Sequence, residues 1–172
     1  MGSIIAYSGE IVGSIMPAFG KVFPIFINVF ALVGCFGAIP AVRWLGRKKN
    51  LEYGALSISL VLILLSYTLS SYDFNDASKN PHSQSYLVMF LFISIRMLYS
   101  LSTGPIVFLY LSETVQAEIL ALSTMVSWFT VAGLNIIFPI LTAFAGGNPA
   151  PVYLFFGIYT FIGFIVNKKL LI

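Results

Sequence analysis

Long apolar runs separated by short polar segments make up most of this chain. Five of the runs are read as crossing a bilayer, which takes about 20 apolar residues in helical form: residues 22–42, 51–72, 85–112, 119–144 and 152–166, the last of them short for a span. A sixth run, 3–16, is too short for a full span and ends at Pro17. The pattern predicts an all-α membrane protein: a single bundle over residues 1–172, with five full transmembrane helices and a partial helix at its N-terminus.

The run 85–112 carries a charge, Arg96, in its interior. An Arg near the bilayer centre costs about +3 kcal/mol on an insertion scale, whereas Leu, Ile, Val and Phe contribute about −0.3 to −0.6 kcal/mol each. Fourteen of these apolar residues lie between Leu87 and Leu111, and together they contribute roughly −4 to −8 kcal/mol. The segment is therefore predicted to insert. It is about 40 Å long as a helix, so we expect it to tilt, or to bend at Pro105.

The basic residues predict the orientation of the bundle. They gather after the first full span and after the last one: Arg43, Arg47, Lys48, Lys49, Lys168 and Lys169. Because cytoplasmic segments carry the excess of Lys and Arg, the loop 43–50 and the C-terminus are predicted to be cytoplasmic. Four crossings separate the two clusters, an even number that agrees with this placement. The loop 73–84 and the turn 146–149 are then predicted to be external.

Composition excludes several classes of protein. The chain is 59% hydrophobic and 9% charged, with a mean hydropathy of +0.96, so the lipid bilayer must be its solvent. The net charge of +3 comes from the clusters that flank the spans and does not indicate a nucleic-acid partner. One Cys and one His do not suffice for a Cys/His metal site, and no cofactor is predicted. Asp73 and Asp76 share one loop and no acid–base constellation assembles, so an enzyme is not predicted.

The ten residues 104–113, GPIVFLYLSE, are the most specific motif. They resemble the GPxxWxxxSE motif on the tenth helix of the sugar transporters of the major facilitator superfamily, with Phe108 where that family has Trp. The chain as a whole resembles the C-terminal six-helix bundle of that fold. The resemblance implies a transporter that alternates between two open states, with its substrate held between two six-helix halves.

The segment from Arg43 to Lys48, RWLGRK, is similar to the signature that follows the eighth helix of the same family. Gly46, Arg47 and Lys48 match the second half of that signature. Its acidic position is Arg43 here, and its first Arg is Trp44. The resemblance implies an inner gate of ion pairs, in which Glu113 pairs with Arg47 and Gly104-Pro105 lets the helix flex. The alternative is that the basic cluster sets orientation only.

The resemblance also implies substrate contacts on several helices. Sugar sites use amides and hydroxyls for the sugar hydroxyls, and aromatic rings for the apolar ring face. The residues in matching places are Asn28, Thr103, Phe108, Trp128 and Tyr7, with Asn135 as a competing candidate. For each of them, ordinary helix packing is an equal alternative. Arg96 and Glu10 are the two charges expected within the membrane region. Either they form an ion pair there, or Arg96 faces a water-filled cleft without Glu10.

The resemblance implies transport of a hexose-like monosaccharide by alternating access, as part of a full transporter. The expected partners are the sugar, the lipid bilayer, and a missing N-terminal half or a second copy of the chain. The alternatives are a degenerate half-transporter that senses or interacts without transporting, and a transporter of another small solute.

Overall fold

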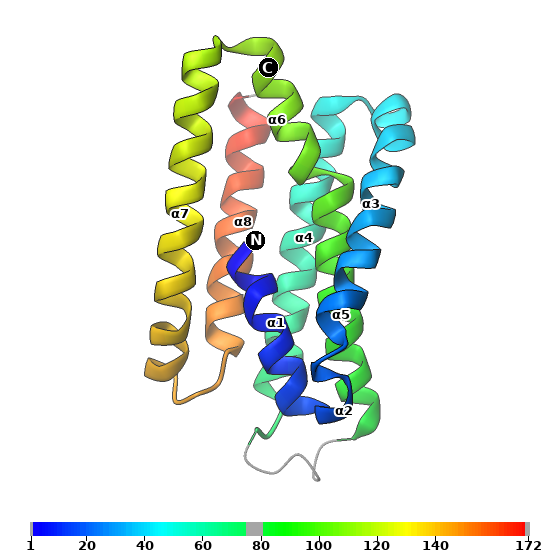
Figure 1. Cartoon of the computed structure of the whole chain (residues 1–172), viewed down its shortest axis with the longest axis vertical. Helices are drawn as coiled ribbons and strands as arrows, with labels where there is room; N and C mark the ends of the chain where they lie inside the picture. Colours follow the sequence, from blue (N-terminus) through cyan, green and yellow to red (C-terminus); the bar gives the residue numbers. More distant parts are fainter. Residues whose placement is uncertain (1, 75–80, 171–172) are drawn as a thin grey trace.

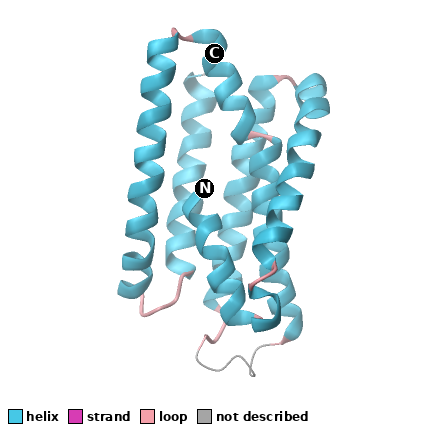
Figure 2. Cartoon of the chain, in the orientation of Figure 1, coloured by secondary structure: helices cyan, strands magenta, loops and turns pink. Residues whose placement is uncertain are grey.

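The computed structural model describes residues 2–74 and 81–170, and this part of the chain is helical without a strand (Figures 1 and 2). The elements follow in order: α1 (Gly2–Ile15), α2 (Pro17–Gly20), α3 (Phe23–Leu45), α4 (Arg47–Ser70), α5 (His82–Leu101), α6 (Thr103–Thr114), α7 (Ala117–Phe144) and α8 (Ala150–Leu170). Five spans are long and apolar enough to cross a membrane, with α5 and α6 counted as one. The prediction of an all-α membrane bundle with five spans and a short first helix is confirmed.

The third span differs from the sequence prediction in where it bends. The expected bend at Pro105 is instead a break at Ser102, whose φ of −122° and ψ of −76° separate α5 from α6. A proline has no N–H and its ring clashes with the carbonyl four residues before it, which here is Leu101. The disturbance caused by Pro105 therefore appears on its N-terminal side, where the helix ends.

The last helix, α8, is longer than the predicted run 152–166. At its start the backbone N–H of Ala150 donates to the side-chain oxygen of Asn148 at 2.9 Å. At its end Lys168 and Lys169 lie in the last turn, where positive charge interacts favourably with the helix dipole. The helix therefore begins directly after the turn that Asn148 stabilises, and it continues past the apolar run through the two lysines.

The centre of the bundle is α4, which packs along α8 and α5. Leu62, Leu65 and Leu69 are fully buried in this core. Two buried hydroxyls tie α4 to α8, because Ser59 donates to the carbonyl of Gly157 at 2.9 Å and Ser66 to that of Ala150 at 2.7 Å. Small residues and interhelical hydrogen bonds are the usual means of helix association in lipid, where apolar burial alone gives no advantage.

Helix α3 packs on α5 through a narrow stripe. Phe23, Ile27, Ala31, Gly34 and Ala38 are buried at helical spacing, and the remaining apolar residues of α3 are mostly exposed. A Cβ on Gly34 would come within 2.7 Å of the carbonyl oxygen of Met97. The glycine therefore allows the two backbones to approach, and the outer face of α3 is left for lipid.

The two basic clusters lie at the same end of the bundle. The α3–α4 turn, the α6–α7 turn and the end of α8 are together at the top of Figure 1, whereas α2 and the α7–α8 turn are at the bottom. Glycines with positive φ lie in a turn at each end of the bundle. Gly46, with φ of +76°, lies in the α3–α4 turn, and Gly146 and Gly147, with φ of +72° and +84°, lie in the α7–α8 turn. Residues 75–80 of the predicted external loop 73–84 lie outside the described part of the chain.

Candidate functional site

An ion pair joins α4 to α6 at the end of the bundle that carries the basic clusters. The guanidinium of Arg47 contacts the carboxylate of Glu113 in a salt bridge between the two side chains. Gly46 turns the chain so that Arg47 is the first residue of α4, while Glu113 lies in the last turn of α6. The structure thus brings together the two residues that the sequence pairs.

The pair is accessible to water, since the two side chains are 42% and 48% exposed. Ion pairs of this kind contribute about 0 to 1 kcal/mol, so the contact can open at little cost. Arg43, in the last turn of α3, is also exposed at this end. The geometry is that of a reversible contact between α4 and α6.

The break between α5 and α6 is enclosed by α4. Ser102 is fully buried and stands against Gly54, which has no side chain to occupy that space. Asn50, 3% exposed, donates its amide to the carbonyl of Leu101 at 3.4 Å. Thr103 follows as the first residue of α6 and is half-buried, with its hydroxyl 3.4 Å from that of Ser102. The predicted substrate residue Thr103 therefore lies at a polar interruption inside the bundle.

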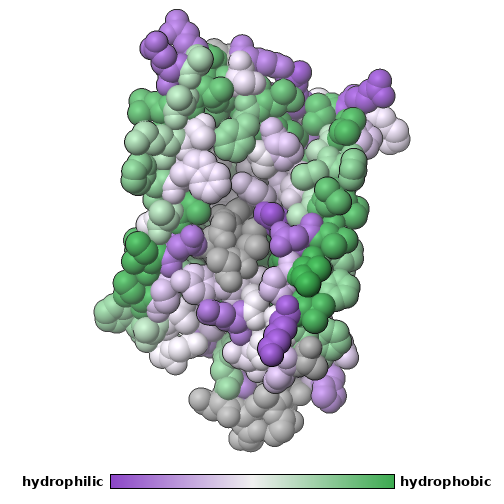
Figure 3. Space-filling model, viewed as in Figure 1, coloured by the Kyte–Doolittle hydropathy of each residue, from purple (hydrophilic) through white to green (hydrophobic). Residues whose placement is uncertain are grey.

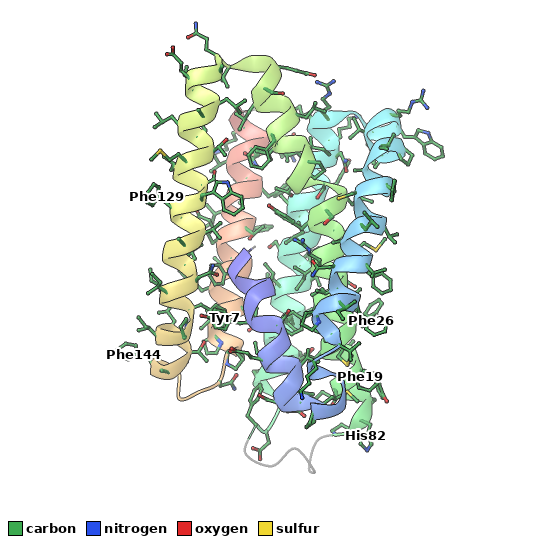
Figure 4. The ribbon with its side chains drawn as sticks, viewed as in Figure 1. Tyr7, Phe19, Phe26, His82, Phe129 and Phe144 are labelled. Carbon is green, nitrogen blue, oxygen red and sulfur yellow. The ribbon has the colours of Figure 1, made fainter. Side chains whose placement is uncertain are left out.

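Tyr7 connects α1 to α7. Its hydroxyl donates to the backbone carbonyl of Asn135 at 2.9 Å, and its ring stacks on Phe138 with centroids 4.7 Å apart. In Figure 4 Tyr7 lies between α1 and α7, whereas Phe129 projects from the other side of α7.

Trp128 lies on the side of α7 that faces α1. It precedes Asn135 by seven residues, about two turns, and so shares its face. The described part of α1 reaches only the middle of the bundle (Figure 1), and the Trp128 side chain is 68% exposed. The described residues therefore leave most of this aromatic ring uncovered.

A cavity of about 370 Å³ opens between α1 and α7, towards the end opposite the basic clusters. Its polar lining comes from Tyr7, Glu10, Ser14 and Thr142, and its apolar lining includes Phe138. Figure 3 shows hydrophilic residues along the middle of this face, with hydrophobic residues on both sides. One face of the bundle is therefore more polar than a surface covered by lipid.

The structure does not bring the remaining candidate residues together. In the described part of the chain Glu10 and Arg96 form no ion pair: Glu10 is exposed and lines the cavity, and the Nε of Arg96 is buried without a hydrogen bond. Asn28 is exposed on α3 and donates its amide to the carbonyl of Pro24 in its own helix at 2.8 Å. Phe108 is 45% exposed on α6.

Sequence reasoning missed two residues of the site, Asn50 and Ser102. Asn50 was placed in the loop 43–50, but it lies one turn inside α4 and is buried. The available signal was the proline: Pro105 predicts an unpaired carbonyl at Leu101, which a nearby polar side chain can satisfy. Among the described residues no group of three His, Cys, Asp or Glu side chains could hold a metal ion.

Comparison with known proteins gives one match. The family model described as "Sugar (and other) transporter" matches residues 1–170 of the chain. No curated protein and no solved structure shows a significant match.

Proposed function

The chain belongs to the sugar (and other) transporter family, and we propose that it carries a hexose-like monosaccharide across the membrane by alternating access, as the C-terminal half of a full transporter. The other half is a second six-helix bundle, supplied by another part of a longer protein or by a second copy of this chain. The substrate lies between the two bundles, near the middle of the membrane. No covalent chemistry is needed, because specificity comes from hydrogen bonds and ring stacking.

The contact between Arg47 and Glu113 is the observation that carries the proposal. We assign it to an inner gate, which joins α4 to α6 while the site is open to the outside and separates when the inside opens. An exposed pair suits this role because its stabilisation is small and reversible. Gly104 and Pro105 allow α6 to move relative to α5, and Arg43 adds positive charge beside the gate.

The substrate contacts belong to the face that holds α1, α6 and α7. Trp128 is exposed and can stack on the apolar face of a sugar. Thr103 offers a hydroxyl at the break before α6, and Phe108 offers a second ring. Asn28 lies on α3 and donates its amide to a carbonyl of its own helix, so it is left out of this set. Tyr7 contributes its ring, since its hydroxyl is occupied by α7.

The orientation follows from the basic clusters. The loop 43–50 and the end of α8 lie at one end of the bundle (Figure 1) and together hold six of the nine Lys and Arg residues. We assign this end to the cytoplasm. The gate between Arg47 and Glu113 then closes the cytoplasmic side.

Two other functions are compatible with membership of this family. Its description includes other solutes, and a half-transporter that binds a sugar without moving it also needs the polar face. The preference for transport over binding rests on the gate between Arg47 and Glu113, which a protein that only binds has no reason to keep. The choice of a hexose rests on the aromatic and hydroxyl groups of the polar face.

Uptake of D-glucose into proteoliposomes tests the proposal, with L-glucose as the matched control for leak. A single copy of the 172-residue chain, reconstituted at a dilution that leaves at most one copy per vesicle, should give no saturable uptake. The chain paired with a second six-helix bundle, either fused to it in frame or contributed by a second copy, should take up D-glucose and not L-glucose. Saturable uptake by the single copy, or a paired protein without stereospecific uptake, would contradict the proposal.

A further inference from the structure

Pro139 leaves one backbone carbonyl of α7 without its usual partner. It lies inside α7 and has no N–H, so the carbonyl of Asn135, four residues earlier, receives no donor from the helix backbone. Inside a bilayer no bulk water replaces the missing donor, so such groups must be satisfied by the protein. The hydroxyl of Tyr7, from α1, donates to this carbonyl at 2.9 Å.

The ring of Tyr7 is held where its hydroxyl meets that carbonyl. It stacks on Phe138 with centroids 4.7 Å apart and an interplanar angle of 11°. Phe138 is 3% exposed and lies one turn along α7 from Asn135, on the same side of the helix. The stacking and the hydrogen bond therefore fix the same ring at two points on α7.

The same arrangement occurs at the other break. Pro105 removes the donor for the carbonyl of Leu101, and the buried Asn50 of α4 donates to it at 3.4 Å. In both places a polar side chain from a neighbouring helix replaces the N–H that a proline lacks. Two helices of the bundle thus contain a carbonyl that lost its backbone donor to a proline and is met by a polar side chain of a neighbouring helix.

We propose that Tyr7 is a positioning residue: its hydroxyl substitutes for the missing N–H of Pro139 and thereby holds α7 against α1. This contact sets the rotation of α7, and with it the side of the helix on which Trp128 stands. Asn50 does the same for the break before α6. The proposal goes beyond the transport function, and it does not depend on which solute is carried or on whether any solute is carried.

The hydrogen bond can be observed directly at the acceptor. Asn135–Ile136 is the one Asn–Ile step in the sequence. Labelling Asn with carbonyl ¹³C and Ile with ¹⁵N in the 172-residue chain makes Asn135 the one labelled carbonyl bonded to ¹⁵N, so a carbonyl–nitrogen correlation spectrum shows its signal alone. Tyr7→Phe keeps the ring and removes the hydroxyl, so the carbonyl resonance should move upfield as its hydrogen bond is lost.

Pro139→Ala provides the decisive second background, because it restores the backbone N–H that pairs with the Asn135 carbonyl. In that background Tyr7→Phe should cause little or no upfield shift and little further loss of thermal stability. If Tyr7→Phe alone does not fold, the double variant should fold. A carbonyl shift unaffected by Tyr7→Phe, or affected equally in both backgrounds, overturns the proposal.

Tyr153→Phe is a matched control. This tyrosine is also buried and also packs against Phe138, with centroids 5.7 Å apart, but its hydroxyl has no hydrogen-bond partner within the described structure. Its removal should leave the Asn135 carbonyl signal in place. An upfield shift equal to that of Tyr7→Phe would mean that general loosening of the bundle, rather than the hydrogen bond, moves the signal, and would also overturn the proposal.

Discussion

Arg47 reaches Glu113 because a single glycine turns the chain between α3 and α4. Gly46 has a φ of +76°, in the left-handed region that other residues avoid. The resemblance of residues 43–48 and 104–113 to the sugar-transporter signatures implied this contact, and the structure contains it. The predicted pairing of Glu10 with Arg96 is absent from the described structure. Such a pairing depends on the depth of α1 and α5 in the membrane and on their rotation about their axes, which no local sequence pattern specifies.

Coupling between Arg47 and Glu113 can be measured with a double-mutant cycle of Arg47→Gln and Glu113→Gln, using thermal unfolding in detergent. We expect a coupling free energy of about 0.2 to 1 kcal/mol, because both side chains are nearly half exposed. It should shrink in about 1 M salt, where the Debye length is about 3 Å. The cycle of Arg43→Gln with Glu113→Gln is the control. Equal coupling in the two cycles, or coupling unaffected by salt, would argue against the gate contact.

At the scale of elements, prolines and glycines decide how the helices meet. The apolar runs predicted the helices well, because the thickness of the bilayer sets their length. They did not predict the break at Ser102, whose position depends on the carbonyl that Pro105 disturbs and on the space that Gly54 leaves for it. Asn50 and the hydroxyl of Tyr7 find their acceptors only after the helices have packed.

The space at Gly54 can be tested by substitution. A Cβ at this position would collide with the Cβ and Oγ of Ser102, which is fully buried. We expect Gly54→Ala to destabilise the chain by about 1 to 3 kcal/mol, the usual cost of overpacking. Gly133→Ala is the matched control, because nothing lies within 4 Å of a Cβ there, and removing a glycine from a helix gains up to about 1 kcal/mol. Similar melting midpoints for the two variants would refute the tight contact at Ser102.

At the scale of the whole molecule, the bundle has two kinds of surface. The outer face of α3 and the Phe129 side of α7 are apolar and exposed, as expected for contact with lipid. The face with α1 carries Glu10, Ser14 and the open cavity (Figure 3). The sequence predicted polar residues within the spans, but it did not show that they gather on one side, since that requires the rotation of each helix.

The accessibility of Trp128 and Phe129 tests most directly whether this polar face borders a watery sugar pathway. Each is replaced by cysteine in a Cys35→Ala background, and the rate of modification by a charged, water-soluble maleimide is measured in the membrane. The cysteine at position 128 should react at least several-fold faster than its neighbour at 129, and D-glucose, but not L-glucose, should slow it in the complete transporter. Equal rates at the two positions, or a faster rate at 129, would place the Trp128 face against lipid and contradict the proposed pathway.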